Sequence, residues 1–270
     1  MKGEHALPER NAETLRKEFA EGFDAVYRAL PQGQTWRRIG REVYGSDYPE
    51  EADPFSTVTL TDLRRIAFEL AVGPGQVIAD IACGQGGPGL WIARETGAAL
   101  VGIDISPVAA AQATERAQAF GLSERARFLV GTAEKTGVDT ASVAGVMSID
   151  AFWLFPDKPA AAAEAARMLE PGGRFTLTTW ECSITPPGWQ PQLADHHDLL
   201  QNAGFVVEVY EETPDWERRQ RAFTASILAA RAELISEMGP IAEHLVTDPA
   251  YIAYRKRVLI VARKEISKWR

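Results

Sequence analysis

Short apolar runs alternate with helical patterns through the middle of this 270-residue chain, and this alternation constrains the fold more than any other feature. The first run, VIADIA at 77–82, is apolar except for one aspartate, which is typical of a parallel strand buried on both faces. A segment with helical spacing follows most of these runs, so the pattern predicts consecutive βαβ units. We expect an α/β fold with a doubly wound, mostly parallel sheet of seven strands. The expected strands are 76–82, 99–105, 126–131, 142–150, 174–180, 205–212 and 257–264.

Two helical regions accompany this alternating core. An amphipathic pattern over 11–30 predicts one helix, and a second at 57–72 ends before a Gly-Pro-Gly turn. Helical patterns return at 215–239 and 240–246 with no strand between them. The expected units are an N-terminal helical segment or lid (1–72), a Rossmann-like cofactor-binding core (73–212 with 256–266) and a helical insertion that caps the substrate (213–255).

Composition limits the classes of partner. The net charge of −8 argues against a nucleic-acid partner, because phosphates would be repelled. Two cysteines, Cys83 and Cys182, exclude a disulfide framework and a thiolate-rich metal site, so we expect a reduced, cytoplasmic setting and no metal. The first residues lack the apolar core of a signal peptide, and no run approaches the roughly 20 apolar residues of a membrane span. We expect a small-molecule ligand and no nucleic-acid or membrane partner. A homodimer is a further possibility, since the first helix could pack on a second copy of the chain.

A glycine-rich turn follows the first strand. Gly84, Gly86 and Gly89 match the pattern G-x-G-x-x-G, and Asp104 ends the second strand about 20 residues later. A carboxylate at that position can accept hydrogen bonds from both hydroxyls of an adenosine ribose. The ribose is common to NAD and S-adenosylmethionine, so these residues do not distinguish the two cofactors.

Asp80 distinguishes them better. A carboxylate at the end of a buried strand needs a partner, and a pyrophosphate beside it would be repelled. A cationic, amino-acid-like cofactor is a suitable partner, although Asp80 could instead cap amides of its own loop. An NAD(P)-dependent oxidoreductase remains the alternative because the glycine pattern is intact.

Five segments in order resemble the motifs of class I S-adenosylmethionine-dependent methyltransferases. They are VIADIACGQGGPG, LVGIDIS, GTAE, VMSIDAFWLFPD and ARMLEPGGRFTLTTW, within residues 76–181, and the strand at 257–264 is similar to the late antiparallel strand of that family. The helical additions resemble its small-molecule, natural-product branch. The resemblance implies in-line transfer of a methyl group to O, N or C of a secondary-metabolite acceptor, with S-adenosylhomocysteine as product. A relative that binds the cofactor without methylating is a further alternative.

The resemblance also implies which residues bind the cofactor. The expected contacts are Asp80 (ammonium), Cys83, Gly84, Gln85 and Gly86 (methionine and ribose), Asp104 (ribose), Ile105 (adenine), Ala133 and Glu134 (adenine edge) and Ser148 (methionine).

Catalysis on a weakly acidic acceptor needs a proton acceptor. Asp150 ends the fourth strand at the carboxyl edge of the sheet, where ligands bind in such folds, or it caps the following loop. His196 and His197 lie at the same edge, or simply start a helix. The aromatic residues expected at the acceptor site or in a lid, unless they belong to the core, are Tyr27, Trp36, Tyr44, Trp153 and Phe155.

Overall fold

The computed structural model describes residues 12–186, 189–245 and 248–266. Within them, the chain forms a seven-stranded sheet of order β3-β2-β1-β4-β5-β7-β6, in which β7 runs antiparallel to both of its neighbours and all other pairs are parallel. The expected α/β class with a mostly parallel sheet is confirmed. The strands are β1 (Val77–Ile81), β2 (Ala99–Asp104), β3 (Ala126–Val130), β4 (Val143–Ile149), β5 (Leu169–Cys182), β6 (Phe205–Glu212) and β7 (Arg255–Lys264).

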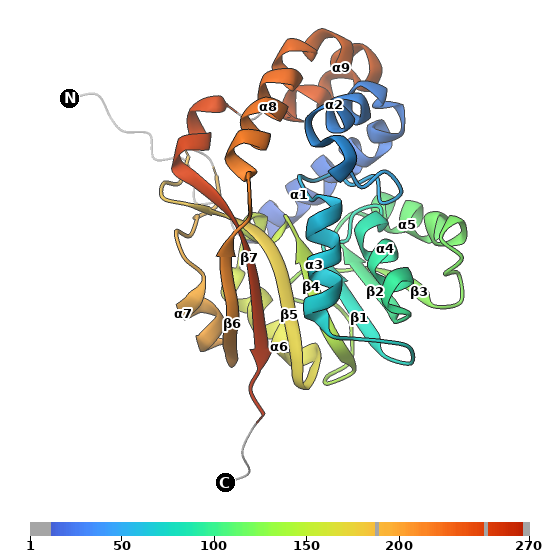
Figure 1. Ribbon diagram of the computed structural model, residues 1–270, viewed down its shortest axis with the longest axis vertical. Helices are drawn as coiled ribbons and strands as arrows, with labels where there is room; N and C mark the ends of the chain where they lie inside the picture. The colour runs from blue at the N-terminus through green and yellow to red at the C-terminus, as the bar shows by residue number, and fades with distance from the viewer. Residues whose placement is uncertain (1–11, 187–188, 246–247, 267–270) are drawn as a thin grey trace, which may run out of the picture.

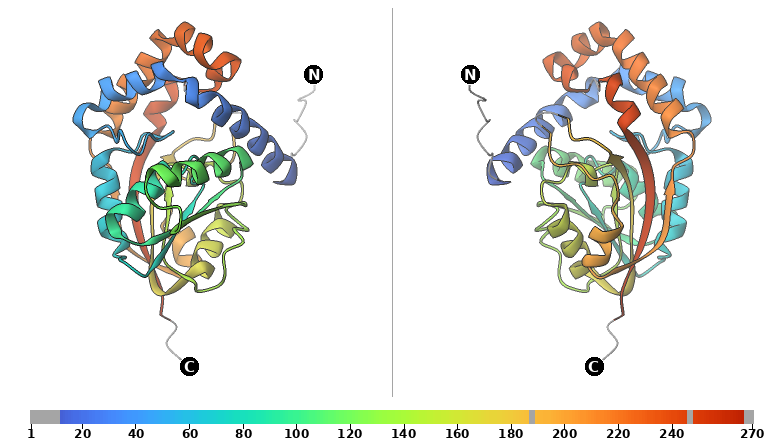
Figure 2. Two further views of the ribbon diagram at one scale, coloured as in Figure 1. Left: turned by 90° about the vertical axis from the view of Figure 1, so that its right-hand side faces the viewer. Right: turned by 90° about the vertical axis from the view of Figure 1, so that its left-hand side faces the viewer.

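Helices cover both faces of the sheet (Figures 1 and 2). One face carries α3 (Leu60–Leu70), α4 (Gly87–Thr96) and α5 (Pro107–Ala119), and the other carries α6 (Lys158–Met168) and α7 (His197–Asn202). On the first face, Leu63 and Leu90 are fully buried together with Ile78 of the central strand. On the second, Phe175 and Leu200 are fully buried in a second core cluster. These two apolar layers fix the strand ends that form the site.

Helix α3 belongs to the sheet layer, although it lies in the segment expected as an N-terminal lid. A capping box starts it: the Thr59 side chain accepts from the Asp62 backbone N–H, and the Asp62 carboxylate accepts from the Thr59 N–H, each at 3.1 Å. Ala71 ends it in the left-handed conformation.

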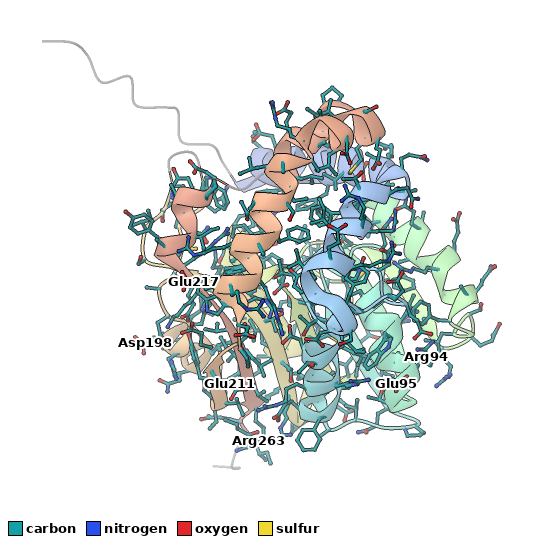
Figure 3. All side chains as sticks on the ribbon, turned by 45° about the horizontal axis from the view of Figure 1, so that its top comes forward. Arg94, Glu95, Asp198, Glu211, Glu217 and Arg263 are labelled. Atoms are coloured by element: carbon teal, nitrogen blue, oxygen red, sulfur yellow. The ribbon has the colours of Figure 1, made fainter. Side chains whose placement is uncertain are left out.

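Four helices form a layer over the carboxyl ends of the strands, which we call the cap: α1 (Ala12–Ala29), α2 (Gln34–Tyr44), α8 (Trp216–Ala229) and α9 (Arg231–Met238). Figure 1 shows the N-terminal helices, in blue, beside the late helices, in orange, at the top of the molecule, and Figure 3 shows the same helices with their side chains. Val26 and Ile39 pack with Phe223 and Leu234 in one apolar cluster, and the Thr35 N–H donates to the Glu237 carboxylate at 2.9 Å. The N-terminal segment and the insertion therefore share one core.

Several details differ from the sequence expectations. Helix α2 was not expected, although Trp36, Ile39 and Val43 recur at helical spacing along it. The segment expected as one helix over 215–239 breaks at Ala230 into α8 and α9, and a 3-10 helix follows at Gly239–Leu245 where an α-helix was expected. The remaining 3-10 helices are Leu30–Gln32, Gly45–Asp47, Phe152–Leu154 and Pro249–Tyr254.

Some expected features fall outside the described part of the chain. These are the start of the first helix at Asn11, the last expected residue of the 240–246 helix, and the initial segment that was judged to lack a signal peptide. Among the helices of the described residues, none combines the length and apolar character that a bilayer span requires.

Candidate functional site

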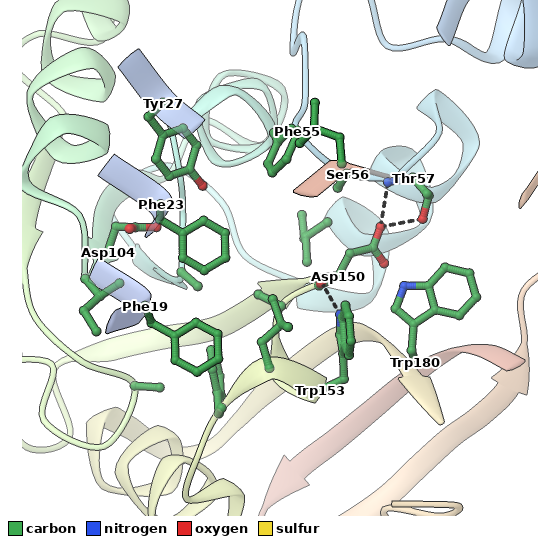
Figure 4. Close-up of a pocket in the computed structure, with 18 of the residues that line it drawn as sticks. Phe19, Phe23, Tyr27, Phe55, Ser56, Thr57, Asp104, Asp150, Trp153 and Trp180 are labelled. Atoms are coloured by element: carbon green, nitrogen blue, oxygen red, sulfur yellow. Dashed lines mark hydrogen bonds between the residues drawn. The ribbon is translucent and has the colours of Figure 1, made fainter. Parts of the chain in front are cut away.

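A cavity of about 280 Å³ lies between the cap and the carboxyl ends of the strands (Figure 4). The strand ends contribute Asp104 from β2, Asp150 after β4 and Trp180 from β5. The cap and the loops contribute most of the aromatic surface. The aromatic residues on the walls are Phe19, Phe23, Tyr27, Trp36, Phe55, Trp153, Phe155, Trp180 and Phe223.

A second, smaller cavity of about 50 Å³ lies beside the glycine turn and is bordered by Asp80, Cys83, Gly84 and Gln85. The two cavities share a junction, because five residues border both. These residues are Tyr27, Phe55, Ser56, Ala82 and Ile149. A ligand with two arms can therefore place one arm at Asp104 and the other at Asp80.

Asp104 ties the glycine turn to the end of β2. Its Oδ2 accepts from the Gly84 backbone N–H at 2.8 Å, and its Oδ1 accepts from the Ser106 N–H at 2.9 Å. Burial raises the pKa of Asp104, while the hydrogen bonds from Ser106 and Gly84 counteract part of that rise. Each carboxylate oxygen retains a lone pair, so Asp104 can still accept from ribose hydroxyls at the cavity wall.

Asp80 lies at the end of β1 and is 2% exposed. Burial, and then the nearby Asp104 carboxylate, raise the pKa of Asp80 well above its usual range. An ionised Asp80 is therefore costly in the free protein, and a cation in the smaller cavity would lower that cost. An ammonium group is such a cation.

Gly84 provides the close backbone approach that the turn needs. Its φ is +54°, and a Cβ added there would lie 2.7 Å from the Tyr27 Oη on α1. Burial raises the pKa of Tyr27 well above 10, with Asp104 the second cause, so its hydroxyl keeps its proton. Helix α1 thus lies against the glycine turn.

The other residues expected at the cofactor fall into two groups. Ile105, Ala133 and Glu134 line the larger cavity, and Glu134 faces Arg16 of α1 at 3.5 Å. Gly86 and Ser148 border neither cavity. A Cβ on Gly86 would meet Ala113 of α5 and Phe128 of β3 at 3.0 Å, so this glycine lets the turn pack closely against both elements. The Ser148 hydroxyl donates to the Ile81 carbonyl at 3.1 Å.

Asp150, the first candidate base, lines the cavity, but both of its carboxylate oxygens already accept hydrogen bonds. Oδ2 accepts from the backbone N–H and hydroxyl of Thr57 at 3.1 and 3.0 Å, and Oδ1 accepts from Arg257 Nε at 2.8 Å. Figure 4 shows the two bonds from Thr57. Asp150 has a φ of +55°, a conformation that aspartate tolerates better than most residues. Its contacts position the loop after Phe55.

The two histidines lie away from the cavity. His196 is 1% exposed; its Nδ1 lies 3.1 Å from Glu181 Oε1, and its ring packs edge-on against Phe152. His197 is solvent-exposed, with Nδ1 3.2 Å from Asp195 and its ring stacked on Tyr210. Neither lines the acceptor space, so their use as bases stays a prediction that these contacts do not support.

Among the expected aromatic residues, Tyr27, Trp36, Trp153 and Phe155 line the larger cavity. Tyr44 instead borders a separate small cavity beside Arg257. Sequence reasoning missed Phe19 and Phe23, which lie one helical turn apart on α1 and face the cavity with Tyr27 (Figure 4). Their spacing was visible, but a helix with an apolar stripe is equally consistent with a core helix.

Comparisons with known proteins agree with this geometry. A family described as a methyltransferase domain matches residues 78–173, which contain nearly all of β1, the glycine turn and β2 to β4. The chain is 30% identical over 129 residues to the methyltransferase GfsG of Streptomyces halstedii, covering 48% of this chain and 46% of the relative. These matches support the class I S-adenosylmethionine-dependent methyltransferase family that the sequence motifs indicate. A methyltransferase domain also supports S-adenosylmethionine, the cofactor that the sequence motifs imply.

Two further similarities extend over about three quarters of the chain. The 27-O-demethylrifamycin SV methyltransferase of Amycolatopsis mediterranei is 28% identical over 194 residues, covering 72% of this chain and 70% of that protein. The crystal structure of the [4+2]-cyclase SpnF has a TM-score of 0.64 at 22% identity, covering 76% of this chain and 81% of that one, and it shares the fold. The chain spans between 37% and 48% of the length of the first curated relatives that it matches.

The residues at the two cavities fit the cofactor of this family. The Asp104 carboxylate and the backbone of Gly84, which carries no side chain, suit an adenosine, and the buried Asp80 suits the ammonium of the methionine arm. A pyrophosphate would place negative charge beside two buried carboxylates, so the structure gives no support to the nicotinamide alternative.

Proposed function

We propose that this protein is an S-adenosylmethionine-dependent methyltransferase that acts on an apolar small molecule. The observation that carries this proposal is the continuous cavity, which runs from Asp104 to the aromatic residues of the cap. Adenosine occupies the end at Asp104, and the acceptor occupies the part beneath α1, α2 and α8.

When bound, the cofactor would supply a methyl group on a positively charged sulfur, and this methyl group would transfer by in-line displacement with the thioether as the leaving group. The residues of this chain hold the reactants and exclude water. Asp104 and Gly84 position the adenosine, Asp80 binds the ammonium, and Tyr27 covers the junction where the two cavities meet. Aromatic faces at that junction favour a positively charged sulfur.

In this proposal, alignment of the acceptor with the methyl group contributes more to the rate acceleration than removal of a proton from the acceptor does. Asp150 is the candidate base that lines the cavity, and three donors from Thr57 and Arg257 already hold its carboxylate. The Tyr27 hydroxyl keeps its proton, because burial raises its pKa. The acceptor therefore supplies its own nucleophilicity, and the cap places it against the methyl group.

The names of relatives support a secondary-metabolite acceptor, since one is a methyltransferase of 27-O-demethylrifamycin SV. The cytoplasmic setting and the homodimer stay predictions from the sequence.

Two measurements test the proposed function. Isothermal titration should show binding of S-adenosylhomocysteine, with NADH binding at least about tenfold weaker, and Asp104→Asn should weaken the former by about tenfold. Incubation with cell extract and cofactor carrying a deuterated methyl group should then yield labelled small molecules in mass spectra. Preferred binding of NADH would refute the cofactor assignment. Binding of S-adenosylhomocysteine without labelled products would point to the non-methylating alternative.

A further inference from the structure

Five charged residues line the larger cavity within residues 12–186, 189–245 and 248–266, and four of them have partners. Arg16 faces Glu134 at 3.5 Å, Asp104 accepts from two backbone amides, and Asp150 accepts from Arg257 and Thr57. Arg255, the first residue of β7, is the exception.

The Arg255 guanidinium has no hydrogen-bond acceptor among the described residues for its Nε and Nη2. These two nitrogens form one edge of the planar guanidinium, the edge that binds both oxygens of a carboxylate or phosphate in parallel. The guanidinium carbon lies 4.7 Å from the centre of the Trp180 ring, which also lines the cavity. Trp180 thus holds the group by a cation–π contact without neutralising its charge.

The charge of Arg255 is costly where it stands. Burial lowers the pKa of Arg255 from its usual value, which means that its surroundings penalise the cation. The neighbouring residue on the strand is different: Lys256 pairs with Glu181 at 2.8 Å on the side away from the cavity. An arginine that remains charged, partly buried and unpaired beside a ligand cavity is explained when the ligand supplies the anion.

We propose that Arg255 binds an anionic group on the acceptor, so that the acceptor is an apolar molecule with a carboxylate or phosphate at one end. This inference rests on the proposed function, because it assigns the substrate class of the same cavity. Arg255 is a specificity residue here and takes no part in the transfer of the methyl group.

The strand register gives the length of such an acceptor. Ile149 at the junction pairs with Thr178, and Trp180 lies two residues farther along β5, so its backbone is roughly 8 Å from Ile149. The guanidinium carbon lies over the ring of this tryptophan, a further 4.7 Å from the ring centre. The anionic group therefore lies on the order of 10 Å from the reacting atom, separated from it by an apolar body that the aromatic walls enclose.

Three probes with the same body and different ends test this proposal: 5-phenylpentanoate, 5-phenylpentyl phosphate and 5-phenylpentan-1-ol. Each is titrated calorimetrically into the full chain with S-adenosylhomocysteine present. At least one anion should bind about tenfold or more tightly than the alcohol. The comparison between the two anions distinguishes a carboxylate from a phosphate acceptor.

Arg255→Met should reduce binding of the preferred anion to the level of the alcohol and leave binding of the alcohol and of S-adenosylhomocysteine unchanged. Lys256→Met removes the same charge from the adjacent position outside the cavity and should change none of these affinities. Equal binding of anions and alcohol, or anion preference that survives Arg255→Met or is lost equally in Lys256→Met, would overturn the proposal. If the unaltered protein does not bind S-adenosylhomocysteine, the proposed function itself would be refuted.

Discussion

Replacing Arg257 by methionine should destabilise the fold strongly, although this residue lies only two positions from Arg255. Arg257 is 3% exposed; its Nε donates to Asp150 and its Nη1 donates to Asp62, both at 2.8 Å. Burial alone would lower the pKa of Arg257, but the carboxylates of Asp150 and Asp62 raise it above its usual value. The guanidinium therefore stays charged and compensates two buried acids.

The expected loss follows from what the substitution leaves behind. Methionine fills a similar volume, so the main effect is that two buried carboxylates lose their common cation. Breaking a buried ion pair from one side costs about 3–5 kcal/mol, which corresponds to a fall in Tm of roughly 6–20 °C for a chain of this size. Because Asp62 also caps α3, the loss should include this helix.

Urea unfolding followed by tryptophan fluorescence measures this loss, and Arg255→Met is the matched control. Arg255 has no ion pair in the described chain, so its replacement should change the free energy of unfolding by less than about 1 kcal/mol. In the Arg257→Met background, Asp150→Asn should recover part of the loss, because it removes one uncompensated charge. Equal stability of the Arg257→Met and unaltered proteins, or equal losses at both arginines, would refute the reasoning.

Three further predictions concern the cofactor side of the site. Burial raises the folded-state pKa of Asp80, so its contribution to stability is fully present below the unfolded pKa and is lost as the pH rises through the folded value. Asp80→Asn should therefore raise the Tm of the free protein more at pH 7 than at pH 4, while it weakens S-adenosylhomocysteine binding, as scanning fluorimetry and calorimetry can measure. Gly84→Ala should weaken S-adenosylhomocysteine binding about tenfold or more, because the new Cβ would contact the Tyr27 hydroxyl. Gly137 also has a positive φ but open space around it, so Gly137→Ala should leave the affinity measured by calorimetry unchanged. Asp24→Ala removes the contact between α1 and the N-terminus of α5 and should speed hydrogen exchange of α1 at a cost of about 1 kcal/mol.

Each of these has a contrary outcome. A stability gain from Asp80→Asn that is the same at both pH values would mean that its ionisation is not the cause. Equal effects of the two glycine substitutions on binding would assign the loss to backbone strain alone. Unchanged exchange in α1 after Asp24→Ala would show that other contacts hold this helix.

The core of the fold was predictable because its determinants are local in the sequence. The apolar runs of β1 to β5 predict buried strands directly, and the glycines at 84 and 86 predict the turn after the first of them. Asp104 was predictable as well, since its distance from the glycine turn fixes it at the neighbouring strand end. The family resemblance rested on these same segments, and the comparisons confirm it.

The acceptor side was less predictable because it depends on contacts between distant segments. The sequence around Arg255 does not show that its guanidinium lacks a counter-ion among the described residues. It also does not show that Arg257 pairs with two carboxylates. His196 was proposed at the strand edge from its order in the chain, but the Glu181 carboxylate draws its ring into the interior. Helix α2 was missed because its buried face is completed by α8 and α9.

The shared core of the cap has a consequence for how new specificities can arise in this scaffold. Phe223 of α8 packs edge-on against Trp36 of α2, and Glu237 of α9 holds the Thr35 amide and hydroxyl. Replacing the helical insertion (213–255) by that of a relative would separate those partners and leave poorly packed contacts between α2 and the inserted helices. A chimera should unfold cooperatively only when residues 12–45 are exchanged together with residues 213–255, so these two segments must diversify in concert.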